Sequence, residues 1–338
     1  QNAEPTFSEI KNAIEEHYAT RDKGNGTGYK IFKRWEHFME PRVYPSGQIE
    51  NFDKKVWDEY HRYKSSASGQ QRANSGNWNF LGATNRITTT GWNAGIGRVN
   101  RIAFHPADTA TFWAATAQGG VWKTTDAGDN WICLTDGLPV LSVSGIAVDY
   151  NNTDIIYIFT GDGEPTNYYI TNVGQSFMLG WKHSIGVLKT TNGGDTWRST
   201  GLTFTQNQQV QPFKLKMHPI DNNILFAVAN DSIYRTADAG LSWQGVVGGN
   251  FRDLEFMPGN PGTIYASTTS AVFISNDHGQ NWAAANAPGI FPVGGAVRIE
   301  LAVTLARPNF VYALAGIPGN YQVLTSSDNC LLYTSDAA

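Results

Sequence analysis

The chain has 338 residues, of which 41% are hydrophobic and 16% are charged, and its formal net charge is −4. This length and composition exclude an intrinsically disordered chain and describe a globular protein with a large core. The sequence contains no run of Lys and Arg, which argues against a nucleic acid as partner. No apolar run reaches the ~18 residues of a membrane span, and two cysteines are too few for a disulfide framework.

Residues 1–72 carry apolar side chains at helical spacing. The spacing predicts three short helices at about 7–18, 31–38 and 56–63, and Ile31, Trp35 and Phe38 form the predicted apolar face of the second. Helices this short are not stable alone. We therefore interpret residues 1–72 as a helical N-terminal extension and linker that packs against the domain that follows, with an autonomous functional domain as the alternative.

A short motif, Ser/Thr-x-Asp-x-Gly-x-x-Trp, occurs four times in the rest of the chain, each time after a predicted strand. This internal repeat is the strongest fold signal in the sequence. Its Asp and Trp positions are Asp126 and Trp131, Asn192 and Trp197, Asp238 and Trp243, and Asp277 and Trp282. The hydroxyl and carboxylate accept from backbone N–H groups of a hairpin turn, Gly supplies a positive φ, and the Trp ring is expected to be buried between units. The acid is thus a structural turn residue, and Asn192 supports this because Asn is a poor general acid or base.

Each repeat predicts a four-stranded unit, so residues 73–329 are expected to form an all-β β-propeller of antiparallel blades. Four blades are complete and a fifth is partial. The predicted inner strands are 99–104, 145–148, 213–217, 252–257 and 297–303, and the second strands are 112–116, 155–160, 224–228, 263–267 and 310–315. Residues 76–81 match the end of a repeat and are expected to be the outer strand of the last blade.

The fifth copy of the motif fails, because Cys330 stands where Gly is required and Tyr333 where Trp is required. Residues 330–338 are therefore interpreted as a non-native tail. An incomplete ring leaves open sheet edges, so the chain is expected to be a fragment of a longer protein.

The four motif copies resemble the Asp-box, or BNR, repeat of β-propellers such as sialidases, xyloglucanases, sortilin-type receptors and a photosystem assembly factor. The resemblance covers Trp78 to the end of the chain. It implies the propeller fold and leaves the function open, because these relatives include hydrolases and binding proteins. The run from Gly28 to Glu36 also resembles the N-terminal region of exported Bacteroidetes proteins that use the type IX secretion system. Gln1 in place of an initiator Met, together with a low content of charged residues and many Gly, Asn, Thr and Trp residues, predicts a secreted or cell-surface protein.

A ligand site is expected on the face opposite the repeat turns, where the loops after each second strand gather. The richest loop is the insertion at 161–183. The candidate ligand-binding residues are Asp162, Glu164, Asn167, Tyr168, Tyr169, Trp181 and His183 in this loop, with Gln118 and Arg298 from other blades. Asp136, Asp231 and Tyr321 are also expected near this face.

Three interpretations of this loop stay open. Carboxylates beside aromatic rings fit a sugar site, in which Asp162 and Glu164 are candidate catalytic acids. The same two acids and Asn167 could hold Ca²⁺. The stretch 161–164 could also be a solvated turn. His105 and His218 precede prolines in equivalent turns and are interpreted as turn residues rather than metal ligands. Apart from the Ca²⁺ alternative, no metal site and no cofactor is predicted.

Two enzymatic relatives can be compared residue by residue. Xyloglucanase-type propellers carry an Arg-Thr-Asp-Ile-Gly-Gly run whose Asp is the general base, and Ala117 occupies that place here. Sialidases require three arginines, an early one of which lies in a Phe/Tyr-Arg-Ile-Pro run. This sequence has no such run, and Arg298 alone is not sufficient. We therefore predict a secreted binding module for a glycan or protein ligand. The alternatives are a glycoside hydrolase acting on β-glucans and a non-catalytic scaffold for an envelope complex.

Overall fold

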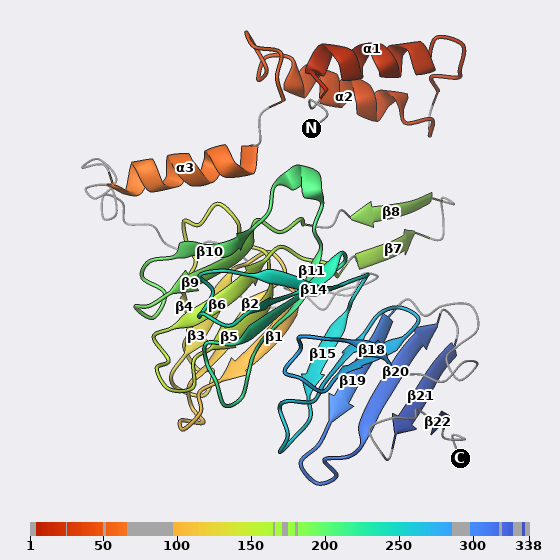
Figure 1. The fold of residues 1–338 in the computed structure, drawn as a ribbon. Coiled ribbons are helices and arrows are strands. Elements are labelled where there is room, and N and C mark those ends of the chain that lie inside the picture. The colour runs from red at the N-terminus through yellow and green to blue at the C-terminus, as the bar shows by residue number, and fades with distance from the viewer. Residues whose placement is uncertain are drawn as a thin grey trace. The chain divides into compact units, whose positions relative to one another are not determined.

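The computed structural model describes residues 5–24, 26–49, 52–65, 97–164, 166–170, 175–179, 182–285, 298–317, 320–326 and 333–334. The chain forms two compact units, residues 1–67 and 68–338 (Figure 1). The predicted domain boundaries at residues 72 and 329 and the predicted strand at 76–81 lie outside the described residues. Among the helices that the structure describes, none has the length and apolar character to cross a membrane.

The first unit contains α1 (Phe7–His17), α2 (Tyr29–Met39) and α3 (Phe52–Ser65), as the apolar spacing predicts. Thr6 caps α1, because its Oγ1 accepts from the N–H of Glu9 at 3.3 Å while the Glu9 carboxylate accepts from the N–H of Thr6 at 2.7 Å. The predicted face of α2 is wrong in part. Ile31 is 71% exposed and Phe38 is 54% exposed. The helix instead buries Phe32 and Met39, because that face packs on the α1 side of the unit.

The second unit is a β-propeller of four-stranded antiparallel sheets, each a blade, with the innermost strand first in the chain. The first three blades are β1 (Val99–Phe104), β2 (Phe112–Thr116), β3 (Val121–Thr124) and β4 (Ile132–Cys133); β5 (Val143–Val148), β6 (Ile156–Thr160), β9 (Gly186–Thr190) and β10 (Arg198–Thr203); and β11 (Pro212–Met217), β12 (Leu225–Ala229), β13 (Ser232–Thr236) and β14 (Gln244–Gly248). The fourth and fifth blades are β15 (Asp253–Phe256), β16 (Ile264–Ser267), β17 (Val272–Ser275) and β18 (Ala283–Ala284); and β19 (Arg298–Val303), β20 (Val311–Ile317), β21 (Asn320–Ser326) and β22 (Tyr333–Thr334).

Successive inner strands contact one another, in the order β1, β5, β11, β15 and β19, which places one end of every blade around a common centre. This confirms the predicted propeller. The short strand β22 pairs with β21 although it lies in the stretch interpreted as a non-native tail. The hairpin of β7 (Thr166–Ile170) and β8 (Gln175–Leu179) in the insertion was not predicted.

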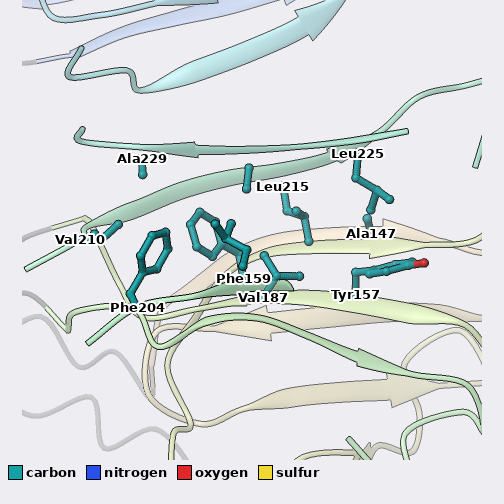
Figure 2. Close-up of a cluster of buried hydrophobic side chains, with 11 residues drawn as sticks. Ala147, Tyr157, Phe159, Val187, Phe204, Val210, Leu215, Leu225 and Ala229 are labelled. Atoms are coloured by element: carbon teal, nitrogen blue, oxygen red, sulfur yellow. The ribbon is translucent and has the colours of Figure 1, made fainter. Parts of the chain in front are cut away.

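Apolar side chains between adjacent blades form the core. Figure 2 shows the cluster between the second and third blades, to which Tyr157 and Phe159 of β6 and Leu225 of β12 belong. These rings are at most 1% exposed. The Tyr157 hydroxyl also donates to the carbonyl of Ala239 in the third blade at 3.1 Å. Adjacent blades are therefore joined by both apolar burial and a hydrogen bond across the interface.

The repeat turns have the predicted hydrogen bonds. In the first copy Thr124 Oγ1 donates to Asp126 Oδ1 at 2.8 Å, and Asp126 Oδ1 accepts from the N–H of Asn130 at 2.8 Å. Hydrogen bonds from the Asn130 backbone and side chain hold the pKa of Asp126 at about 2. The residue before Gly is also left-handed, with φ of 61° at Ala127 and 55° at Ala239, a feature that the sequence did not predict.

The predicted burial of the four repeat tryptophans is confirmed only for Trp197. Its ring is 4% exposed, and its Nε1 donates to the carbonyl of Leu134 in the preceding blade at 2.9 Å. Trp243 and Trp282 are half-buried. Trp131 is 38% exposed and packs edge-on against Phe112 of its own blade. The prediction fails at Trp131 because the described residues place no preceding blade against its ring.

Candidate functional site

The loops after the second strand of each blade lie at the end of the sheets opposite the repeat turns. In the first blade Val99 pairs with Thr116, so the β2–β3 loop lies beside the start of the inner strand. The second blade repeats this arrangement, because Val143 at the start of β5 pairs with Thr160. The predicted site residues Gln118, Asp162 and Glu164 follow these second strands and therefore share one face of the propeller.

A pocket of about 670 Å³ opens on this face between the first and second blades. It is lined by Gly97, Arg98, Val99, Thr116, Ala117, Gln118, Gly119, Trp122 and Asp162, and we call it the Trp122 pocket. Trp122 Nε1 donates to the carbonyl of Gly119 at 2.7 Å, which fixes the indole ring. Thr116 Oγ1 accepts from the N–H of Gly119 at 2.8 Å and holds the β2–β3 loop.

Asp162 supplies the carboxylate of this pocket. The residue is only 8% exposed, and its side chain forms an ion pair with Arg98. Asp162 Oδ1 also accepts from the N–H of Glu164 at 3.2 Å. Burial raises the pKa of Asp162, although Arg98 and the Glu164 N–H act in the opposite direction. The interpretation of residues 161–164 as a solvated turn is therefore wrong, since this carboxylate is buried against an arginine of the neighbouring blade.

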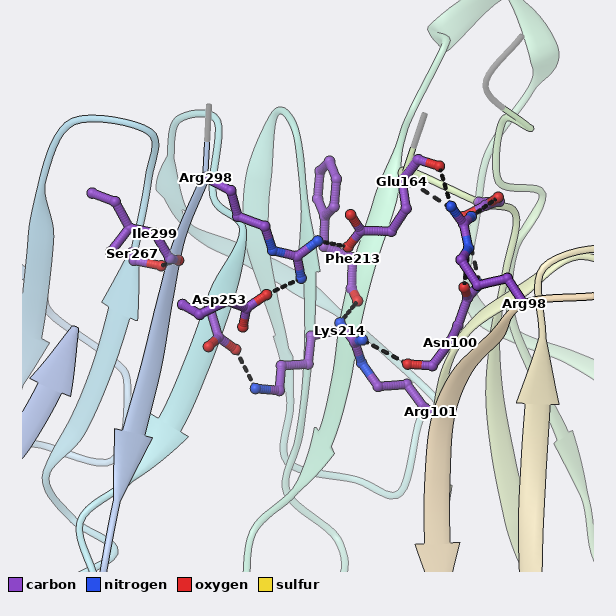
Figure 3. A network of polar contacts seen from close by, with 12 residues as sticks. Arg98, Asn100, Arg101, Glu164, Phe213, Lys214, Asp253, Ser267, Arg298 and Ile299 are labelled. Atoms are coloured by element: carbon purple, nitrogen blue, oxygen red, sulfur yellow. Dashed lines mark hydrogen bonds and ion pairs between the residues drawn. The ribbon is translucent and has the colours of Figure 1, made fainter. Parts of the chain in front are cut away.

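Glu164 extends from the second blade toward the fifth. Its carboxylate pairs with Arg298, the first residue of β19, and its backbone carbonyl accepts from Arg98 Nη1 at 2.9 Å (Figure 3). Arg98 thus joins the predicted residues Asp162 and Glu164, and Glu164 in turn joins them to Arg298. The described residues bring together no group of three or more His, Cys, Asp or Glu side chains for a metal ion. The calcium interpretation also requires the side chain of Asn167, which lies outside the described part of the chain, so it stays a prediction.

A network of charged side chains lies on three neighbouring inner strands, β11, β15 and β19, and we call it the channel network. Its members are Lys214, Lys216, Asp253, Glu255, Arg298 and Glu300. Lys214 Nζ contacts Glu255 Oε1 at 2.6 Å and also pairs with Asp253, whose side chain is fully buried (Figure 3). The N–H of Leu301 donates to Asp253 at 2.8 Å.

Two carboxyl groups of the channel network have opposite pKa shifts. Burial works to raise the pKa of Asp253, but Lys214 outweighs it, so this carboxylate stays ionised. Burial and the neighbouring Asp253 charge raise the pKa of Glu300 to about 7. The Glu300 side chain is therefore partly protonated at neutral pH.

Several predicted site residues play other roles or lie outside the description. Trp181 lies outside the described residues, and Asn167, Tyr168 and Tyr169 lie on β7, of which only the backbone is described. The same holds for Tyr321 on β21. His183 is half-buried. The Asp231 carboxylate accepts from the Tyr234 hydroxyl at 2.6 Å, as a hairpin residue does.

Arg98 and Trp122 were missed as site residues. Trp122 lies near the start of β3, the strand that leads into the first repeat turn, and was interpreted only as part of a strand. Arg98 immediately precedes the first inner strand. Strand alternation in β3 is the signal that could have found Trp122, because it places this ring on the face opposite buried Val121.

The fold and the site define a β-propeller with an aromatic and charged pocket at the loop end of its blades. No protein-family model matches the chain. Its sequence is 26% identical over 271 residues to a xyloglucanase of Paenibacillus sp, covering 69% of this chain and 26% of that enzyme. It is 25% identical over 225 residues to xyloglucanase Xgh74A of Acetivibrio thermocellus, covering 56% of this chain and 26% of the relative. The chain thus spans about a quarter of the length of these curated relatives.

The fold is similar to that in a crystal structure of an ancestral GH74 enzyme. The TM-score is 0.54 at 17% sequence identity, with 71% of this chain and 31% of the other covered. This similarity supports the propeller fold.

Proposed function

We propose that this propeller is the saccharide-binding part of a glycoside hydrolase that acts on a β-glucan of the xyloglucan type. The observation that carries the proposal is the Trp122 pocket, which combines an indole ring with Arg98, Gln118 and a buried Asp162 carboxylate. The ring can stack on the apolar face of a pyranose, and the polar groups can hydrogen-bond its hydroxyls. The xyloglucanase relatives supply the substrate class.

Asp162 is the residue of the pocket best suited to proton transfer. A general acid at a glycosidic bond needs a raised pKa, and burial raises that of Asp162. Glycoside hydrolysis also requires a second carboxyl group on the other side of the bond. Glu164 is held on Arg298, so the second group would come from outside the described residues.

A binding module without hydrolytic activity is the second candidate. Ala117 favours it, because this residue lines the pocket at the place where the xyloglucanase-type run carries its general base. In that case Asp162 and Arg98 would position sugar hydroxyls and transfer no proton.

Calorimetric titration of the full chain with a xyloglucan heptasaccharide tests binding. The Trp122→Ala variant is expected to lose about tenfold or more in affinity, which is about 1.4 kcal/mol. Trp131→Ala is the matched control, because Trp131 belongs to a repeat turn at the opposite end of the same blade. Equal affinity of the two variants would refute the assignment of the pocket.

Release of reducing ends from xyloglucan separates the two candidates. Hydrolysis by the wild type that Asp162→Asn abolishes, with binding retained, supports the enzyme. Binding without hydrolysis by the complete natural protein supports the binding module.

We also propose that the repeat is an Asp-box repeat and that the protein is secreted or exposed at the cell surface by a type IX route. The sequence motif and the turn hydrogen bonds support the first statement. The resemblance of the run from Gly28 to Glu36 to exported proteins supports the second, and so does the proposed substrate, because xyloglucan lies outside cells. Detection of the protein in the culture medium or on intact cells, and its loss when the secretion system is deleted, tests the location.

A further inference from the structure

Two arginines from different blades contact Phe213 in β11, and a third, Arg298, is close enough to Arg252 to repel its charge. Arg101 of β1 donates from Nη2 to the Phe213 carbonyl at 2.7 Å. The Arg252 guanidinium lies over the Phe213 ring, 4.1 Å from its centroid. Arg298 begins β19, the inner strand next to the one that Arg252 precedes. All three lie at or near the starts of inner strands, on the face that carries the Trp122 pocket.

The positive charge of this group is only partly balanced. Arg298 pairs with Glu164 and Glu300. Among the described residues, Arg252 has no carboxylate within ion-pair distance, and the Arg101 side chain donates only to backbone carbonyls. The Nε atoms of Arg101, Arg252 and Arg298 are all buried with no hydrogen-bond partner in the described part of the chain. Burial of a cation without an anion is costly, so an anion at this place would stabilise the group.

The pKa shifts agree with this imbalance. Burial lowers the pKa of Arg252, and the nearby Glu164 charge only partly offsets it. Glu300, with a pKa of about 7, carries a partial charge at neutral pH and neutralises Arg298 incompletely. The Arg298 side chain is still 26% exposed, so a ligand can reach it.

Glu164 shows what kind of anion fits. Its carboxylate already contacts Arg298, and planar carboxylates match the donor geometry of a guanidinium. Its backbone carbonyl accepts from Arg98, which lines the Trp122 pocket (Figure 3). A saccharide in that pocket therefore lies next to residues that are in direct contact with the arginine group.

We propose that Arg252 and Arg298 bind the carboxylate of a uronate residue in the bound polysaccharide, and that the Glu164 carboxylate occupies this position until the ligand displaces it. The inference rests on the proposed function, because the saccharide reaches the arginines from the Trp122 pocket. It adds a substrate class, an acidic β-glucan, to that function.

The test uses two matched probes, cellotetraose and the same oligosaccharide oxidised at C6 to uronates. Calorimetry on the full chain at low salt is expected to give about tenfold tighter binding of the oxidised probe, and this preference should shrink in 0.5 M NaCl because salt screens the contact. Arg252→Met is expected to abolish the preference and leave cellotetraose binding unchanged. Glu164→Gln is expected to increase the preference severalfold, because it removes the competing carboxylate.

Arg307→Met is the control, since the Arg307 guanidinium also lies over a phenylalanine ring, 5.2 Å from the centroid of Phe310, and takes no part in this group. It should keep the preference of the wild type. If Arg252→Met does not fold, Glu164→Gln decides alone. Equal binding of both probes by the wild type, or no increase in Glu164→Gln, overturns the inference.

The two proposals fail in different ways. Binding of cellotetraose without any preference for the oxidised probe refutes the uronate site and leaves the glucan proposal standing. Binding of the oxidised probe alone supports the uronate site and contradicts a neutral-glucan substrate. Binding of neither probe refutes the uronate site, and the titration with the xyloglucan heptasaccharide then decides the glucan proposal separately.

Discussion

The contact of Trp197 with the preceding blade predicts a large cost for its truncation. Trp197→Ala removes a ring that is 4% exposed and a hydrogen bond from Nε1 to the Leu134 carbonyl at 2.9 Å. Truncation of a buried Trp costs about 3–5 kcal/mol, and the lost hydrogen bond adds about 1 kcal/mol. The change in the free energy of unfolding is therefore expected to be about 4–6 kcal/mol.

Urea unfolding followed by far-UV circular dichroism measures this change. Trp131→Ala is the matched control, because Trp131 occupies the same motif position but is 38% exposed, and its loss should stay below about 2 kcal/mol. Similar losses in the two variants would contradict the account of how the blades are joined, as would a loss below about 2 kcal/mol in Trp197→Ala.

Three further predictions concern titratable groups. Asp238→Asn should destabilise far less than Trp197→Ala in the same urea assay, because Asn192 accepts the equivalent hydrogen bonds at 2.8 and 3.0 Å; a comparable loss would show that the charge of the acid is required. Burial lowers the pKa of His218, so the stability that its neutral form contributes is present above about pH 6.5 and is lost as the pH falls below that value. His218→Gln should therefore make Tm less dependent on pH in this range. An unchanged dependence of Tm on pH would contradict the lowered pKa. Burial and the Asp253 charge raise the pKa of Glu300 to about 7, so the free energy of unfolding should fall as the pH rises from about 4.5 to 7. Glu300→Gln should remove this fall, measured by urea unfolding at both pH values. If the fall persists in the variant, a group other than Glu300 causes it.

The repeat determines most of what the sequence could predict about the fold. Alternating strands and the fixed spacing of Thr124, Asp126 and Trp131 are local signals, and they placed the blades and the turn hydrogen bonds correctly. Burial of the Trp rings depends on which blade lies beside each turn. Local sequence does not carry that information, so Trp197 and Trp131 could not be distinguished.

The site was predictable only in part for the same reason. Asp162 and Glu164 are a pair of acids in a long insertion, which made them candidates, and in the structure each forms an ion pair with an arginine. Their partners Arg98 and Arg298 lie far away in the chain and meet them only when the blades close around a centre. The ion pair of Lys214 with Asp253 joins neighbouring inner strands and has no local signature either.

The position of a bound xyloglucan oligosaccharide in a crystal structure tests the central claim most directly. The account predicts a pyranose ring stacked on the Trp122 indole, with hydroxyls hydrogen-bonded to Asp162 and Arg98. An oligosaccharide bound at the repeat-turn end of the blades, with the Trp122 pocket empty, would contradict it.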